Sequence, residues 1–202
     1  MQETFISKAR MSKYNDELEY VKNVKFSQFH YPLLHYFEIT FRNKINGFYA
    51  NNFGDNWLIE LPSILNFDKS IIDRVNDSKF KIKNNIITNN DIIANLTLGF
   101  WVELFNPRYL LRTKLYKEQV YSIFAISKKN IHKKYLIKLH NELNTIRSFR
   151  NRIFHYEKVL DNPKYSHAPK ILEYLLYRMD DKYYIQKMLK HFDIILTPPP
   201  RL

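Results

Sequence analysis

The chain has 202 residues, no cysteine, three glycines and a net charge of +12, from 32 Lys and Arg against 20 Asp and Glu. Without cysteine there is no disulfide, thiolate metal site or cysteine nucleophile, and without clustered glycines there is no phosphate-binding loop of the ATPase or dinucleotide kind. The charge favours a polyanionic partner, nucleic acid before an anionic membrane. The chain is also rich in Asn, Ile and Lys, as AT-rich coding sequences tend to produce, so part of the lysine excess has a compositional explanation open.

The N-terminal part is predicted to be helical. Ser12 is a candidate N-cap for a short helix through Leu18 and Val21, and a long helix is expected from about 26 to 49. Apolar residues recur there at helical spacing, namely Phe29, Leu33, Phe37, Phe41, Ile45 and Phe48. Pro32 either lies near the start of this helix, where a missing N–H is tolerated, or kinks it.

The middle of the chain, from about 51 to 90, is irregular. Asp91 is the predicted N-cap of the next helix, and Pro107 is expected to end that helix and begin another. The helices predicted in this part cover 57–61, 69–80, 92–105, 108–116 and 119–126.

The C-terminal part is predicted to hold a long helix over about 131–158, followed by a break at Pro163. Its apolar stripe consists of Leu136, Leu139, Leu143, Ile146, Phe149 and Ile153. Two further helices, over 169–178 and 181–195, precede a proline-rich tail at 197–202 that we expect to be extended.

These patterns predict an all-α bundle in one domain spanning 1–202, with 1–25 as an N-terminal helical extension. The N-terminus lacks the order of a signal peptide, and no apolar run is long enough to span a bilayer, so we expect a cytoplasmic protein.

The predicted long helix ends in Arg150-Asn151-Arg152-Ile153-Phe154-His155. An arginine, a polar residue and a following histidine in this order resemble the signature of the HEPN superfamily. The flanking Ile146-Arg147 and Tyr156-Glu157 resemble the Abi-like (AbiD/AbiF) branch of abortive-infection proteins. Upstream, the segment 98–105 and the Glu-x-x-x-Arg helix that holds Glu38 and Arg42 resemble the same branch, in the same order.

This resemblance implies a HEPN-type bundle with extra N-terminal and peripheral helices. It implies a homodimer in which two motifs face one cleft, and RNA cleavage without metal or cofactor. The ribose 2′-OH would attack the adjacent phosphorus, so DNA is not an expected substrate. A toxin or antiviral effector of this kind needs restraint, and a small inhibitory RNA is a family-level expectation for its partner.

In that mechanism His155 is the general acid or base, because histidine side chains titrate near working pH. Asn151 lies one helical turn before His155 and on the same face, so it is placed to orient the imidazole or the substrate. Arg150, about 140° away on an ideal helix, would reach round to hold the phosphate. The candidate RNA-backbone contacts are Arg147, Arg152, Lys128, Lys129, Lys133 and Lys134.

Each candidate also has a structural interpretation. The arginines are favourably placed near a helix C-terminus, His155 is a candidate capping or interface residue, and the lysines suit a solvated face. Glu38 and Arg42 suit a helical ion pair, with a role in ordering the active-site helix left open. The histidines at 30, 35, 132 and 140 lack the spacing and acidic neighbours of a metal site, so no metal is expected. Phe100 and Trp101 suit the core better than stacking on RNA bases.

Three functions therefore remain open at this point. The chain is a ribonuclease, a non-catalytic RNA-binding module, or a purely structural interaction protein.

Overall fold

A computed structural model of the protein describes residues 6–61, 68–83, 86–180 and 183–196. Helices and turns make up these ranges, and no strand occurs in them, so the predicted all-α class is confirmed. The α-helices are α1 (Lys8–Met11), α2 (Glu17–Phe53), α4 (Lys69–Lys81), α5 (Asn89–Asn95), α6 (Leu98–Glu103), α7 (Pro107–Leu110), α8 (Tyr116–Phe124), α9 (Lys133–Phe154), α10 (Ala168–Met179) and α11 (Tyr184–Leu189). Short 3-10 helices are η2 (Lys128–Asn130), η3 (Pro163–Tyr165) and η4 (Lys190–Phe192).

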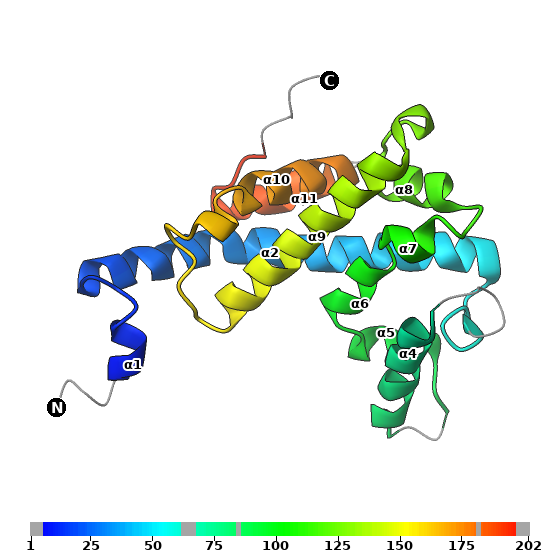
Figure 1. Ribbon diagram of the computed structural model, residues 1–202, viewed down its shortest axis with the longest axis horizontal. Coiled ribbons are helices and arrows are strands. Elements are labelled where there is room, and N and C mark those ends of the chain that lie inside the picture. The colour runs from blue at the N-terminus through cyan, green and yellow to red at the C-terminus, as the bar shows by residue number, and fades with distance from the viewer. Residues whose placement is uncertain (1–5, 62–67, 84–85, 181–182, 197–202) are drawn as a thin grey trace.

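Helix α2 is the spine of the molecule (Figure 1). It packs against α8, α9, α10 and α11, while α9 crosses it obliquely and also contacts α6 and α10. The C-terminal end of α9 lies toward the N-terminal part of α2, on the same side of the molecule as α1, whereas α4 and α5 lie near the other end of α2 (Figure 1). The fold thus separates the predicted catalytic segment, at the end of α9, from α4 and α5.

The predicted start of the first helices was wrong. Asp16, rather than Ser12, caps α2, because its side chain accepts a hydrogen bond from the backbone N–H of Glu19 at 2.7 Å. Ser12 instead ends α1. Residues 17–25 therefore belong to the spine and not to a separate extension, and Pro32 lies well inside a continuous helix.

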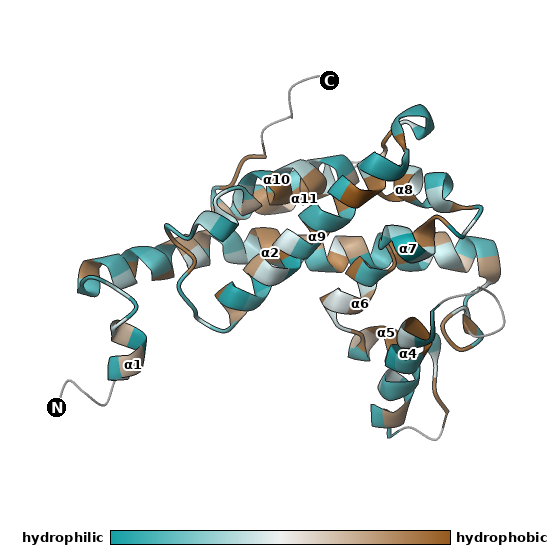
Figure 2. Ribbon diagram, viewed as in Figure 1, coloured by the Kyte–Doolittle hydropathy of each residue, from teal (hydrophilic) through white to brown (hydrophobic). Residues whose placement is uncertain are grey.

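One face of α2 and one face of α9 form the centre of the core. The α9 stripe predicted from the sequence is buried at every position, and the α2 stripe is buried except at Phe29, which is 49% exposed. Hydrophilic and hydrophobic residues alternate along α9 and α10, as expected for helices with one buried face (Figure 2). Phe149 on α9 contacts the rings of Phe26, His30 and Tyr165, so the end of α9 is anchored on the spine.

Several predicted boundaries in the middle of the chain were wrong. Thr88, rather than Asp91, is the N-cap of α5, and Asp91 completes a capping box with it. The helix expected over 92–105 breaks at residues 96–97 into α5 and α6, and the one expected over 108–116 shortens to α7. Residues 55–59 form turns.

Later boundaries also differ. Ala125, in the left-handed region with φ 51°, ends α8 before the predicted limit. The helix expected over 181–195 is reduced to α11 and η4 in its described part, and the predicted tail at 197–202 lies outside the described residues. Across the described ranges, no helix is long and apolar enough to cross a membrane.

Candidate active site

The predicted catalytic segment forms the end of α9 and the turn after it. His155 is the C-cap, and its backbone N–H donates to the Asn151 carbonyl at 2.9 Å. Tyr156 follows with φ 57°, its N–H donating to the Ile153 carbonyl at 3.0 Å, while the Glu157 N–H donates to the Arg152 carbonyl at 2.9 Å. This pair of bonds is a Schellman motif, which normally has glycine at the position of Tyr156.

One face of this helix end lines a hollow of about 280 Å³. The lining residues are Arg147, Ser148, Asn151, Arg152, His155 and Glu157. Asn151 and His155 are both exposed there, as their one-turn spacing predicts. No hydrogen bond joins these two side chains in the described part of the chain, so both keep polar atoms for a substrate.

Arg150 does not line this hollow. Its Nε donates to Glu38 Oε2 at 3.0 Å, which ties α9 to α2, and its guanidinium lies over the Phe154 ring at 4.1 Å from the centroid. The expected ion pair between Glu38 and Arg42 was therefore wrong, and Arg42 Nε donates to the neighbouring Asn43 Oδ1 at 3.4 Å. Glu38 instead joins α2 to α9, the helix that carries the motif, through Arg150.

Arg150 nevertheless reaches the edge of the hollow. Its Nη1 lies 3.5 Å from Asn151 Oδ1, and Asn151 is one of the lining residues. Within a single chain, the guanidinium thus sits between Glu38 and the predicted catalytic face, not over His155.

Arg147 is the arginine that faces the hollow without an acidic partner in the described residues. It packs on α6, where a Cβ added to Gly99 would meet Arg147 Nη1 at 3.4 Å. The Arg147 guanidinium thus lies directly against the glycine of the 98–105 segment. A cation held in this way is available for a phosphate.

Arg152 has its charge engaged within the chain. It contacts the Glu157 carboxylate and hydrogen-bonds the Tyr165 hydroxyl, and this bond raises the pKa of Arg152. Burial alone would raise the pKa of Tyr165, but hydrogen bonds with Ser148, at 2.9 Å, and with Arg152 lower it on balance. Ser148 and Tyr165 were missed in the sequence, because they lie 17 residues apart and only the fold brings them together.

The turn after His155 is fixed by the N-terminal part of the spine. Asn23, buried in α2, accepts hydrogen bonds through Oδ1 from the backbone N–H groups of Val159 (2.8 Å) and Leu160 (3.0 Å), and donates to the Glu157 carbonyl at 3.3 Å. Arg10 Nη1 donates to the Tyr156 carbonyl at 2.9 Å. Residues 1–25, which were expected to be an extension, therefore include two residues, Arg10 and Asn23, that hold the turn after His155 in place.

The four predicted RNA-binding lysines lie elsewhere. Residues 128–134 are at the opposite end of α9, whose 22 residues from Lys133 to Phe154 span about 33 Å at 1.5 Å per residue. Lys128 also pairs with Glu118 at 3.1 Å. These lysines cannot hold the phosphate that His155 would act on, although they remain candidates for a distant part of a long RNA.

Other candidates proved structural. Phe100 and Trp101 are each 1% exposed and belong to the core, so the core interpretation is confirmed. His30 is buried against Phe26 and Phe149, and burial lowers its pKa. Within the described ranges, no group of three or more His, Asp or Glu side chains is arranged to hold a metal ion.

Comparison of the chain with protein-family models, with curated proteins and with solved structures finds no match in any of the three. The site therefore has to be interpreted from its own residues.

Proposed function

We propose that the protein is a metal-independent endoribonuclease of the HEPN type, similar to the Abi-like abortive-infection proteins. The observation that carries the proposal is that one hollow at the end of α9 is lined by His155, Asn151 and Arg147, an arginine without an acidic partner in the part of the chain that the structure describes. A 2′-OH attack on a phosphodiester needs groups that move protons and stabilise charge on the phosphate, and an imidazole and a guanidinium supply one of each.

Each residue has a separate task in this mechanism. His155 takes the proton of the 2′-OH or gives one to the leaving 5′-oxygen, and Arg147 stabilises the charge that develops on the phosphate oxygens. Asn151 orients the ribose or the imidazole. Arg150 is then a positioning residue in its own chain, since Glu38 holds its Nε and Phe154 covers its guanidinium.

A homodimer completes the proposal. One histidine does not perform both proton transfers at once, and His155 is exposed on the surface. A second copy facing the same cleft would supply the second histidine. We propose further that the protein acts on cytoplasmic RNA as a toxin or antiviral effector, and that a partner such as a small RNA restrains it.

Cleavage of RNA by purified protein in EDTA tests the reaction. We expect product ends with a 2′,3′-cyclic phosphate, and no cleavage at a linkage whose 2′-OH has been removed. His155→Ala should lower the rate by about 100-fold or more, the usual contribution of general acid–base catalysis. The matched control is His167→Ala, which removes an exposed histidine before α10 whose side chain makes no capping hydrogen bond.

Substitution of Arg147 tests the proposed mechanism, in which Arg147 binds the phosphate, against the role that the sequence motif implies for Arg150. If Arg147 is the phosphate ligand, Arg147→Ala should lower cleavage by about 100-fold, in the range seen for lost charge-stabilising donors, with thermal stability retained. Undiminished cleavage by His155→Ala would overturn the proposed chemistry.

A second function is favoured by one observation. Arg152 is engaged by Glu157 and Tyr165, which leaves the hollow of a single chain with fewer free cations than the motif suggests. A non-catalytic RNA-binding module fits such a site, because the net charge of +12 still attracts RNA while the hollow has fewer cations to stabilise a phosphate that is being cleaved. It would bind RNA with an affinity that falls with salt and would show no turnover under any condition tested.

A further inference from the structure

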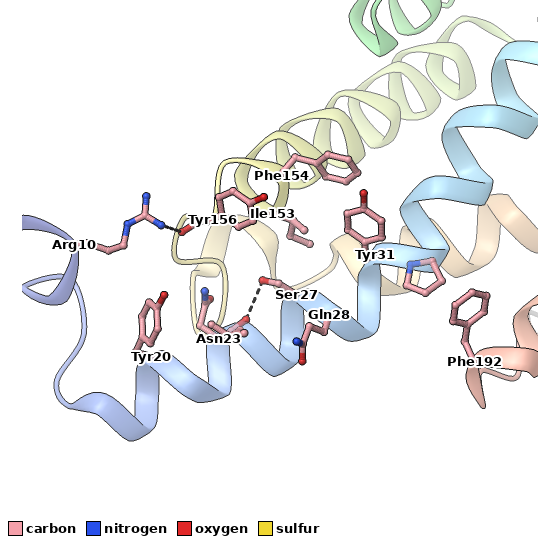
Figure 3. Close-up of a pocket in the computed structure, with 12 residues that line it drawn as sticks. Arg10, Tyr20, Asn23, Ser27, Gln28, Tyr31, Ile153, Phe154, Tyr156 and Phe192 are labelled. Atoms are coloured by element: carbon pink, nitrogen blue, oxygen red, sulfur yellow. Dashed lines mark hydrogen bonds between the residues drawn. The ribbon is translucent and has the colours of Figure 1, made fainter. Parts of the chain in front are cut away.

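A second and larger concavity lies next to the candidate active site. This groove has a volume of about 650 Å³ and runs between the N-terminal part of α2, the end of α9 and η4 (Figure 3). Aromatic rings dominate its lining, namely Tyr20, Tyr31, Phe154, Tyr156 and Phe192. Its volume is in the range of pockets that take small organic ligands.

The groove and the hollow both include residues from the end of α9. Phe154 and Tyr156 line the groove, and His155, between them in the chain, lines the hollow. A ligand bound at His155 is therefore only one residue along the chain from the aromatic groove. Arg150 links the two, because its guanidinium covers the Phe154 ring while its Nη1 reaches Asn151.

Several aromatic rings of the groove are exposed and do not belong to the core. Tyr156 is 76% exposed, and Tyr31 and Phe192 are each 52% exposed. Tyr31 already stacks on Phe154, with centroids 4.8 Å apart and planes 14° from parallel. Phe154 is thus covered by Tyr31 and Arg150, and the accessible faces are those of Tyr31, Tyr156 and Phe192. Nucleobases stack on accessible aromatic faces.

Tyr156 is held in an unfavourable backbone conformation. Its φ of 57° is the left-handed region, where a Schellman motif favours glycine. The Arg10 side chain and the backbone bonds of the turn fix it there (Figure 3). These bonds hold the Tyr156 ring at the groove, which it lines.

The largely apolar groove also has polar groups that suit a nucleotide. Arg10 contributes a cation at one end, and the exposed Gln28 carboxamide makes no hydrogen bond among the described residues. Pro32 has no N–H for the Gln28 carbonyl, so this carbonyl lacks its ordinary helical donor. Aromatic faces with a cation and free amide groups match a base attached to a phosphate chain.

We propose that this groove binds a nucleobase of single-stranded RNA whose adjoining backbone lies against His155. The inference rests on the proposed function, because it takes RNA as the substrate. It makes the enzyme selective for unpaired RNA, since a base inside a duplex cannot enter the groove.

The test measures binding with cleavage switched off. In a His155→Ala background, the affinity for a short adenosine oligoribonucleotide is compared with that for an abasic chain of the same length. We expect the bases to tighten binding by about ten-fold or more, the scale of one stacked base. Tyr156→Gly and Phe192→Ala should remove most of this ratio.

Tyr156→Gly is the sharper variant, because glycine suits the left-handed turn and the fold should be kept. The matched control is Tyr184→Ala, which removes a ring that is 65% exposed on α11 outside the groove. Equal affinity for adenosine and abasic chains, or an unchanged ratio in Tyr156→Gly, would overturn the inference. The inference would also be overturned if Tyr156→Gly and Phe192→Ala converted a dimer to a monomer and left the ratio of the two affinities unchanged. That result would mean that a second copy of the chain occupies the groove.

The two proposals fail in different ways. RNA cleavage by the unmodified protein, together with base-independent binding, would keep the ribonuclease and overturn the groove. Base-dependent binding that Tyr156→Gly abolishes, without any cleavage by the unmodified protein, would keep the groove and overturn the catalysis.

Discussion

The ion pair between Glu38 and Arg150 offers a direct test of how the fold supports the site. Its N···O distance is 3.0 Å, and the two side chains are 28% and 27% exposed. Coulomb attraction at this distance is about 1.4 kcal/mol at the dielectric constant of water and about 5.5 kcal/mol at an effective value of 20. Desolvation and lost side-chain entropy offset most of it, so we expect a coupling of about 1 kcal/mol.

A double-mutant cycle measures this coupling. Glu38→Gln and Arg150→Met keep the approximate size of each side chain, and urea unfolding of the four proteins gives their free energies of unfolding. The contact of Arg150 with the Phe154 ring is lost in both proteins that carry Arg150→Met, so it cancels from the coupling.

The exposed pair of Lys128 and Glu118 is the matched control. Its N···O distance is 3.1 Å and its side chains are 50% and 43% exposed, so its coupling should be smaller, about 0.3–0.5 kcal/mol. A Glu38–Arg150 coupling below about 0.3 kcal/mol, the usual error of additivity, would refute the claim that this pair anchors α9 to α2.

Three further predictions concern the spine and the core beneath the site. Gly47→Ala should raise the free energy of unfolding by about 0.5–1 kcal/mol, because a Cβ at this position inside α2 meets nothing within 4 Å; a lower thermal midpoint would contradict this. Phe149→Ala should lower the free energy of unfolding by about 3–5 kcal/mol, since the ring is fully buried beneath the hollow, and a loss below about 1 kcal/mol in urea unfolding would be inconsistent with that packing. Burial lowers the pKa of His30, so the unfolded chain binds more protons, and stability should fall as the pH drops below the ordinary histidine value of about 6.5. His30→Phe should reduce this fall between pH 7.5 and 5.5, and burial of His140, which likewise lowers its pKa, should leave a remainder; an unchanged pH dependence would exclude His30 as a source.

The sequence by itself determined the helical class and the long helix that carries the motif. The α9 stripe repeats at helical spacing, and every member is buried, because period and burial are two expressions of the same helix geometry. It also placed Asn151 and His155 on one face, since residues four apart on a helix share a face wherever the helix packs.

Helix ends were determined less well. The starts of α2 and α5 depend on which of several nearby Asp, Ser and Thr side chains makes the capping bond. Short caps of similar strength differ by little in free energy, so packing selects among them.

The partners of the site were decided by the tertiary structure. Glu38 and Arg150 are 112 residues apart, and their pairing follows from the crossing of α2 and α9 rather than from any local pattern. The same crossing turns Arg150 away from the hollow and leaves Arg147 facing it. The aromatic groove also arises only when the start of α2, the end of α9 and η4 come together. Contacts between segments far apart in the chain depend on how the helices pack, and a single sequence contains no local signal for that packing.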